Sequence, residues 1–388
     1  MTVTTDRPAL WTRDYTLTLA AMHLYFLSFY GLFAALPLYL EDWSDAAIGL
    51  NVGAMSFAAV VARPFAGVVI DQTGRRRSML WGAAITAVGV LALAATDNPY
   101  ALLPARLLHG AAIAFFTTAT LALVTDVVPP DRRGQGVAYF GVLNNSVAAY
   151  APFLGLAVAE GAGFGVLVAG LAATTLVSFV LTLPIHEPQA GEGHPDDEPT
   201  RLVSRRALPS AAAFLGVTVA FGATQAFGAL FAEDRDLGNA GAFFALNGIM
   251  QTLGRFPAGP LVDRFGRGAV AVPGLLLAGA AMFALASGAS VTFFLGGAML
   301  GLAVALTHTA LLAQTMDRAG PRERGAAIAT FTNSWDAGAV VGATMLGPVA
   351  AAFGYPTVFV ITGAVGFASA AGYPFLHRRP KSAALAGR

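Results

Sequence analysis

One short string occurs twice in this chain, and each copy interrupts a long apolar stretch. RPFAGVVIDQTGRRR at 63–77 is matched by RFPAGPLVDRFGRG at 255–268. Five residues of the first copy lie 192 positions before their counterparts: Arg63, Gly67, Asp71, Gly74 and Arg75 before Arg255, Gly259, Asp263, Gly266 and Arg267. An Asp, Gly and Arg cluster between such runs is typical of a tight loop joining two membrane helices, because Gly permits unusual backbone angles and Arg stays on the cytoplasmic side. The chain is therefore a duplication of a membrane-embedded unit.

The composition agrees with lipid as the main solvent. Of the 388 residues, 56% are hydrophobic and only 12% are charged, whereas soluble proteins carry about 25% charged residues. The chain has no cysteine, which excludes disulfides and thiolate metal sites. Because the first apolar run is long enough to span a membrane, we expect no cleavable signal peptide.

Apolar runs of about 20 residues predict the spanning helices. Six are expected in the first half, at 15–40, 46–70, 78–95, 100–124, 136–159 and 164–184. Six more are expected in the second half, at 209–231, 241–262, 268–287, 291–315, 325–352 and 356–376. The sequence thus predicts an all-α membrane protein with twelve transmembrane helices. We expect six-helix bundles over 1–185 and 209–388, joined by a polar cytoplasmic linker over 186–208.

Charge predicts the orientation. The loops on one side of the predicted spans contain nearly all the Arg residues, among them Arg75–Arg77, Arg132 and Arg133. The opposite loops contain mostly Asp and Glu, with Arg235 as their only basic residue. By the positive-inside rule, both termini and the linker lie in the cytoplasm of a bacterium or archaeon, with the chain in its inner membrane.

The duplication continues beyond the opening string. PPDRRGQG at 129–136 is similar to GPRERGAA at 320–327, with Pro130 and Arg133 matching Pro321 and Arg324 at an offset of 191. Each segment lies in the predicted cytoplasmic turn between the fourth and fifth helices of its half. The two halves are therefore expected to be parallel copies of one six-helix unit.

The repeated string also carries a resemblance. The pattern Gly-x-x-x-Asp-(Arg/Lys)-x-Gly-Arg-(Arg/Lys) resembles the loop between the second and third helices of the major facilitator superfamily of transporters, although Gln72 and Gly268 depart from it. The resemblance implies two six-helix bundles facing each other across a cavity, with substrate near the bilayer midplane. The motifs of the first half together resemble the bacterial drug and metabolite efflux branch, which exchanges drugs for protons.

Two residues in the fourth span are candidates for proton coupling. LPARLLHGAAIA at 103–114 resembles the family motif Leu-x-x-Arg-x-x-Gln-Gly, which is implicated in proton coupling in many antiporters. Arg106 matches the motif, and His109 replaces its Gln one turn away on the same face. An imidazole can exchange a proton near neutral pH, while the alternative for His109 is a neutral ring bonded to a neighbouring helix.

Asp336 is the only carboxylate well inside a predicted span. It lies 12 residues after Arg324, which places it about 18 Å along the helix, near mid-membrane. Such a carboxylate can exchange a proton for a cationic substrate. The alternative is a static ion pair with Arg106 or Arg255 that locks one conformation.

Gating is expected from the two repeated strings and from one proline. Because Arg63 and Arg255 occupy equivalent places, we expect them to cap carbonyls or to pair between the halves rather than to bind substrate. The resemblance implies a cytoplasmic clasp formed by Asp71, Arg75 and Asp126, and more weakly by Asp263 and Arg267. Gly67 and Gly74 of the same string are expected to take part in gating. Pro152 removes a backbone donor and predicts a hinge or gate in the fifth span.

The family fold places the cavity among the first, fourth, seventh and tenth helices, with contributions from the fifth, eighth and eleventh. The polar and aromatic candidates for its lining are His23, Tyr25, Phe29, Tyr30, Gln225, Asn144, Asn145, Asn247, Gln251, His308, Asn333 and Trp335. Many of these could instead bond helix to helix, as amide side chains do in lipid.

The sequence indicates a transporter rather than an enzyme. It has no Walker-type loop for ATP, no nucleophile and base arrangement, and no His pair spaced for a metal. We expect a monomer that needs no cofactor or nucleic acid and that exports a small organic molecule, such as a drug, metabolite or metallophore, in exchange for protons by alternating access. A proton-coupled or facilitative importer of a polar metabolite or siderophore-like compound is the alternative, followed by a membrane receptor that transports nothing.

Overall fold

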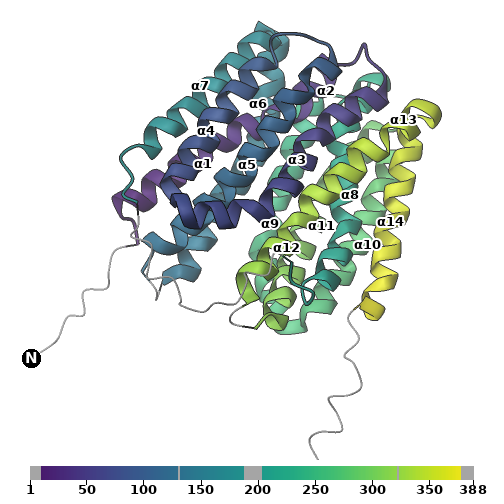
Figure 1. Cartoon of the computed structure of the whole chain (residues 1–388). Coiled ribbons are helices and arrows are strands. Elements are labelled where there is room, and N and C mark those ends of the chain that lie inside the picture. Colours follow the sequence, from purple (N-terminus) through teal and green to yellow (C-terminus); the bar gives the residue numbers. More distant parts are fainter. Residues whose placement is uncertain (1–9, 130–131, 188–202, 321–322, 377–388) are drawn as a thin grey trace, which may run out of the picture.

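The fold is all-helical and consists of two bundles side by side (Figure 1). This computed structural model describes residues 10–129, 132–187, 203–320 and 323–376. The first bundle contains α1 (Arg13–Tyr30), α2 (Leu32–Tyr39), α3 (Asp45–Thr73), α4 (Arg75–Ala92), α5 (Pro99–Val127), α6 (Arg133–Ala162) and α7 (Phe164–Thr182). The second contains α8 (Leu208–Asp234), α9 (Ala240–Phe265), α10 (Arg267–Ala286), α11 (Ser290–Arg318), α12 (Arg324–Val340), η3 (Val341–Met345), α13 (Gly347–Phe353) and α14 (Tyr355–Leu376).

These helices form twelve crossings, because α1 continues into α2, and α12 continues through η3 into α13. Within the described residues, ten helical segments are long and apolar enough to cross a membrane by themselves. The other two crossings are α4, which starts with three arginines, and α9, which contains Arg255 and Asp263. The predicted twelve-helix membrane fold is confirmed, and the predicted division at 186–208 falls between α7 and α8.

Two helices are interrupted in ways that apolarity does not predict. The first crossing breaks at Gly31 between α1 and α2, and the eleventh contains one π-helical segment at 341–345. A π-helical segment inserts extra backbone into a turn and often marks a functional position. Both interruptions lie where the halves meet, since α2 contacts α8, and η3 contacts α3.

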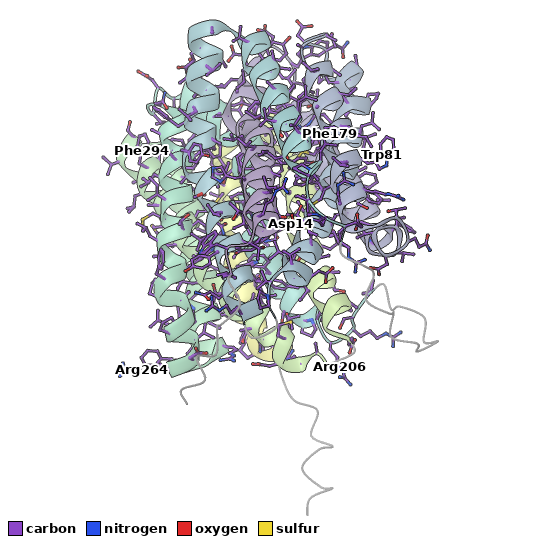
Figure 2. The ribbon with its side chains drawn as sticks, turned by 90° about the vertical axis from the view of Figure 1, so that its left-hand side faces the viewer. Asp14, Trp81, Phe179, Arg206, Arg264 and Phe294 are labelled. Carbon is purple, nitrogen blue, oxygen red and sulfur yellow. The ribbon has the colours of Figure 1, made fainter. Side chains whose placement is uncertain are left out.

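The ends of the bundle differ in charge. We call the terminal face the end that carries the start of α1 and the glycine turns at Gly74 and Gly266, whose φ angles are 99° and 89°. The far face carries the start of α3 and the end of α13. Figure 2 shows Arg206 and Arg264 at the terminal face and Trp81 on a side of the bundle, where it is 69% exposed. The predicted separation of basic and acidic loops is therefore a separation of two faces.

The halves meet along two interfaces, α3 against α12–α13 and α6 against α9. Near the far face the first is very close: any side chain at Gly49 would collide with the carbonyl oxygen of Ala343. Tyr355 Oη also donates to Asp45 Oδ1 at 2.7 Å. In the second interface, a side chain at Gly248 would collide with the backbone of Ala148. The two halves are thus sealed against each other toward the far face.

Candidate functional site

A partly buried ion pair joins the two halves. Arg63 in α3 donates from Nη2 and Nε to Asp336 Oδ2 at 2.7 and 3.2 Å, and from Nη1 to Thr117 Oγ1 at 3.2 Å. The two charged side chains are only 12% and 17% exposed. Because Arg63 and Asp336 belong to different bundles, this pair must lengthen or break whenever the α3–α12 interface opens.

The partner of Asp336 differs from both expected partners. A static pair with Arg106 or Arg255 was one sequence-based alternative, but the carboxylate contacts Arg63. The reason is packing, because α12 runs along α3. Arg106 lies on α5, and Arg255 lies on α9, which packs against α6 at the other interface between the halves. Arg63 thus contacts a side chain of the opposite half.

Arg255, at the equivalent place in the second half, has no such partner. Its Nε is buried without a hydrogen-bond acceptor, and no acidic side chain of the described residues forms an ion pair with it. The Tyr30 hydroxyl and the His308 ring lie within electrostatic range of this guanidinium. Two arginines from the same repeated string therefore have different environments.

Arg106 and His109 lie deep in the first half. Arg106 is 4% exposed, and its Nε donates to the Asn51 carbonyl at 3.3 Å. His109 is 1% exposed, and neither ring nitrogen has a hydrogen-bond partner. Arg106 borders a small recess between the halves, together with Phe29, Phe33 and Gln225. The guanidinium thus reaches the space between the bundles, whereas the structure shows no acceptor for a proton on His109.

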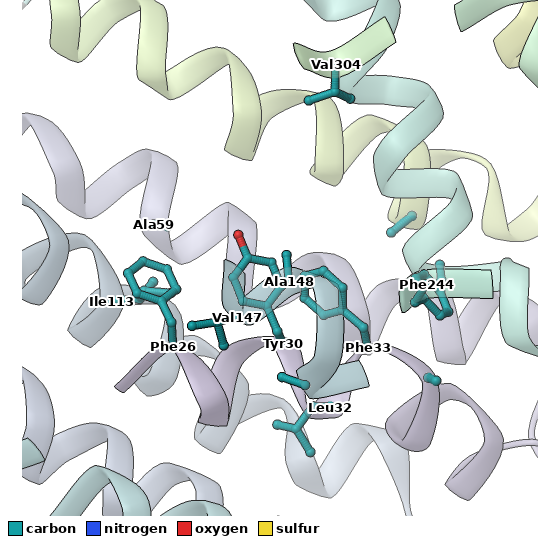
Figure 3. Close-up of a cluster of buried hydrophobic side chains, with 14 of the residues drawn as sticks. Phe26, Tyr30, Leu32, Phe33, Ala59, Ile113, Val147, Ala148, Phe244 and Val304 are labelled. Carbon is teal, nitrogen blue, oxygen red and sulfur yellow. The ribbon is translucent and has the colours of Figure 1, made fainter. Parts of the chain in front are cut away.

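Aromatic side chains from both halves fill the centre (Figure 3). Phe33 lines the first recess and also a second small one, which Tyr30, Asn247 and Gln251 complete. The ring centroids of Phe33 and Phe221 lie 6.2 Å apart, and those of Phe221 and Trp335 lie 5.2 Å apart. Both recesses are small and lie between the halves.

Not every predicted lining residue reaches this space. Tyr25 is fully buried inside the first half, stacked on Phe116 at 3.7 Å and bonded to Thr86 at 2.7 Å. His23 joins α1 to α6 by contacts with Tyr150 Oη and the Leu143 carbonyl. Asn144 and Asn333 each have a buried Oδ1 without a partner, so their amides have hydrogen-bonding capacity to spare.

The glycines of the two interfaces are packed more loosely toward the terminal face. Gly67 and Gly259 each lie four residues after their arginine and hence on the same helix face, the one turned to the opposite half. A side chain at either glycine would meet nothing within 4 Å. At Gly49 and Gly248, toward the far face, it would collide with the opposite half. The structure is therefore closed at the far face and open at the terminal face.

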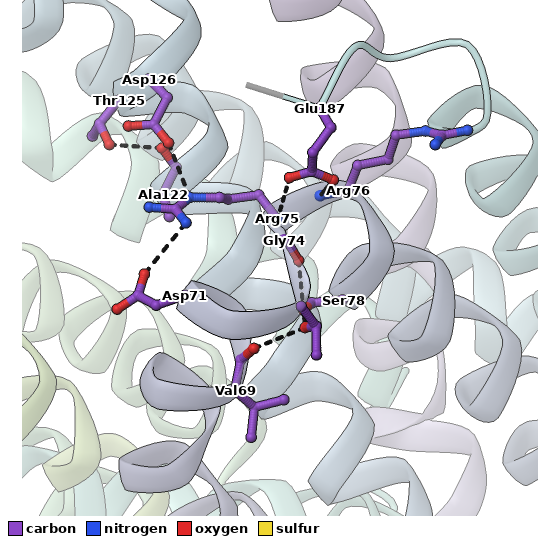
Figure 4. Close-up of polar contacts among 11 residues, drawn as sticks. Val69, Asp71, Gly74, Arg75, Arg76, Ser78, Ala122, Thr125, Asp126 and Glu187 are labelled. Atoms are coloured by element: carbon purple, nitrogen blue, oxygen red, sulfur yellow. Dashed lines mark hydrogen bonds and ion pairs between the residues drawn. The ribbon is translucent and has the colours of Figure 1, made fainter. Parts of the chain in front are cut away.

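Each half has a charged clasp at the terminal face. Arg75 binds Asp126 at 3.0 Å and Asp71 at 3.3 Å (Figure 4). In the second half, Arg267 binds Asp317 at 2.9 Å and Asp263 at 3.5 Å. The structure brings together the clasp residues expected from the resemblance. All of these contacts join helices of one half, so here the clasps do not cross between the halves.

Sequence reasoning missed two residues of these clasps. Asp317 lies 191 positions after Asp126, the same offset as in the adjacent repeated segment, so the signal was present in the chain. Glu187 accepts the backbone N–H groups of Arg75 and Arg76 at 2.6 and 3.1 Å and so caps α4 (Figure 4). Nothing in the linker sequence distinguishes this glutamate from its acidic neighbours.

Comparison with known proteins gives the family. The sequence matches the Major Facilitator Superfamily over residues 18–251 and 236–387. The chain is 29% identical to an uncharacterised MFS-type transporter of Salmonella typhimurium over 94% of its own length and 97% of that protein. It is 23% identical to the staphylopine export protein of Staphylococcus aureus over 82% of its length and 84% of that protein.

Solved structures share the fold. A mutant of the nucleoside transporter NupG matches with a TM-score of 0.77 at 16% identity, over 94% of this chain and all of that one. The human organic anion transporter MFSD10 matches with a TM-score of 0.69 at 20% identity, over 96% of this chain and all of that one. These identities establish only a common fold.

The family match defines a multi-pass membrane transporter and not an enzyme. The chain belongs to the Major Facilitator Superfamily and is a secondary transporter.

Proposed function

We propose that this protein exports a small organic molecule in exchange for protons by alternating access. The Arg63–Asp336 pair carries the proposal, because it is a titratable contact that joins the two bundles. Asp336 lies about 18 Å from the terminal end of α12, near mid-membrane. Proton binding at this carboxylate removes the charge that attracts Arg63 and so weakens one specific interface between the halves.

The direction follows from the orientation proposed by the positive-inside rule. With the basic terminal face in the cytoplasm, the described conformation opens inward and is sealed outside. A substrate then enters from the cytoplasm and meets Arg63–Asp336 before the narrow aromatic recess. Both termini are cytoplasmic in this arrangement, and the membrane is the cytoplasmic membrane of a bacterium or archaeon.

Coupling requires that proton and substrate favour different states. A ligand shifts a conformational equilibrium only by its different affinity for the two states. The ionised Asp336 stabilises the inward-open α3–α12 contact, whereas its neutral form allows the halves to separate there and the terminal face to close. Arg106 supplies a fixed positive charge near the bottom of the recess, and His109 is a second candidate proton carrier beside it.

The staphylopine export protein supports an organic metallophore or a similar polar metabolite as cargo. That relative is distant, so the substrate class needs its own evidence. Polar side chains at the recesses, including Gln225, Asn247 and Gln251, favour an amphipathic or polar molecule over a purely lipophilic one.

The decisive experiment measures proton release from the purified protein in weakly buffered detergent when substrates are added. The panel contains organic cations, antibiotics and metallophores, and the variants are Asp336→Asn and His109→Gln. Asp317→Asn serves as the matched control, since its carboxylate lies in an exposed clasp. We expect release in the wild type and the control and its loss in Asp336→Asn.

Other outcomes point to the alternatives. Loss of proton release only in His109→Gln would identify His109, and not Asp336, as the proton carrier. Substrate binding without proton release in every variant would contradict proton exchange and favour a facilitator or a receptor. Measuring substrate flux into vesicles then distinguishes these two, because only a facilitator transports.

A further inference from the structure

The two interfaces between the halves are related by the duplication, and their charged residues can be compared. Arg63 corresponds to Arg255 at the offset of 192. Moving Asp336 back by 192 or by 191 gives Asn144 or Asn145. Whichever offset applies, the carboxylate of the α3–α12 interface is replaced by an amide in the α6–α9 interface.

The packing of α6 and α9 favours Asn144 as the counterpart. Ala148 and Gly248 are the residues in backbone contact. Asn144 lies one turn before Ala148, and Arg255 lies seven residues after Gly248, so both return to the contacting faces. Because the helices are antiparallel, their α-carbons are about 6 and 10 Å from that contact in the same direction, a difference that an Arg side chain spans.

Unsatisfied atoms occur on both of these residues. Asn144 Oδ1 and Arg255 Nε are both buried without a hydrogen-bond partner. Asn145, in contrast, uses its amide on the Gly141 carbonyl of its own helix. A guanidinium without a counter-ion is costly in a low-dielectric interior, so the place opposite Arg255 lacks the negative charge that Asp336 supplies to Arg63.

Resting on the proposed function, we propose that the substrate is an organic acid, and that its carboxylate binds Arg255 in the place that corresponds to the side chain of Asp336. Arg presents a planar fork that matches a carboxylate. The Tyr30 hydroxyl and the His308 ring lie within electrostatic range of the same guanidinium. The rest of the molecule extends toward Phe33 and Arg106 along the recesses.

The charge balance of the interior agrees with an anionic group. Arg63 and Asp336 neutralise each other. Among the described residues, neither Arg106 nor Arg255 forms an ion pair with an acidic side chain. The space between the halves is therefore net positive, and it attracts organic anions while repelling organic cations.

The first test needs no ligand. Asn144→Asp should build a second ion pair with Arg255 and raise the melting temperature of the full-length protein in detergent. Asn145→Asp is the matched control and should lower the melting temperature, because it buries a carboxylate away from Arg255. Adding Arg255→Gln should abolish the gain from Asn144→Asp. Equal destabilisation by both aspartates would overturn the assigned geometry.

The second test measures binding at fixed pH. The probes are citrate, N-acetylglutamate and hippurate, each beside its amide, with phenyl phosphate and tetraphenylphosphonium as the alternative anion and cation. We expect carboxylates to bind better than their amides, and we expect their affinity to fall at least about tenfold in Arg255→Gln. In Asn144→Asp the new carboxylate should occupy the guanidinium of Arg255 and weaken binding of the probes. Arg255→Lys should retain part of the affinity.

The outcomes separate this proposal from proton exchange. Carboxylate binding without proton release would support the Arg255 site and contradict the antiport mechanism. Proton release caused only by tetraphenylphosphonium would keep antiport and overturn the carboxylate site, as would carboxylate binding that Arg255→Gln does not change. Preference for phenyl phosphate over all carboxylates would also overturn the assignment of the substrate as an organic acid.

Discussion

The α3–α12 and α6–α9 interfaces are copies of one arrangement, yet among the described residues only the first contains an ion pair. Arg63 is bonded to Asp336 at 2.7 Å, while the Nε of Arg255 has no acceptor. The glycine contacts near the far face and the open glycines at Gly67 and Gly259 occur in both. Duplication has thus preserved the mechanical elements of the two interfaces, whereas the charges have diverged.

This difference assigns separate tasks to equivalent positions. The paired interface contains its own titratable group, and so its strength can depend on proton binding. The unpaired interface keeps a partly buried positive charge that forms no ion pair among the described residues, so we propose that its counter-ion comes from the substrate. The sequence-based argument that symmetric arginines do not bind substrate assumed equivalent surroundings, and the structure shows that the surroundings differ.

The largest effect is expected when the paired interface is made to resemble the unpaired one. Asp336→Asn leaves Arg63 partly buried without its counter-ion, which costs about 3 kcal/mol of folding free energy and should abolish proton-driven flux in proteoliposomes. Thermal unfolding and flux measure the two effects. The charge-swapped double variant Arg63→Asp/Asp336→Arg should recover much of the stability, and no recovery would show that the pair is not the cause.

Cysteine labelling checks whether both interfaces open at the same face. Since the chain contains no cysteine, single reporters have no background. Gly67→Cys and Gly259→Cys should react with a membrane-impermeant maleimide from the cytoplasmic side. Ala148→Cys and Ala343→Cys, which are 7% and 0% exposed at the parent residues, should react at least about tenfold more slowly, in line with the opening free energy of packed segments. Similar rates at all four positions would contradict the sealed far face.

Bulk at the open glycines should affect transport more than folding. A Cβ at Gly67 or Gly259 meets no neighbour within 4 Å in the described conformation, so we expect Gly67→Leu and Gly259→Leu to change the melting temperature little. Closing the terminal face brings the helices together, and a branched side chain there should slow flux several-fold, as overpacking costs about 1–3 kcal/mol in the closed state. An effect at only one of the two glycines would show that the interfaces close unequally.

The smallest effect is expected at the far-face contact that only the first interface has. Tyr355→Phe removes the hydrogen bond to Asp45 and should cost about 1–2 kcal/mol, seen as a modest drop in melting temperature. Transport should continue. If opening of the far face limits the transport rate, the substrate-free protein should change between its inward-open and outward-open states faster than the wild type. Tyr373→Phe, which loses a bond to Gln314 inside the second half, provides the control for a lost tyrosine hydroxyl.

Most of the fold was predictable from the sequence. Apolar runs of membrane-spanning length locate all twelve crossings because lipid requires each span to satisfy its own backbone. Two repeated strings at a constant offset give the duplication and the terminal-face turns. The clasps were predictable as well, and Asp317 was within reach of the same offset.

The sequence alone determined the duplicated twelve-helix fold, the separation of basic and acidic faces, and which few charged residues lie in lipid-spanning segments. Only the tertiary structure decided that Asp336 pairs with Arg63, that Arg255 lacks a partner, and that the far face is sealed. The physical reason is that hydropathy and charge act on each segment by itself. Pairing across the halves depends instead on how the helices are rotated and how closely they approach each other. Contacts such as Gly49–Ala343 and Gly248–Ala148 determine this approach.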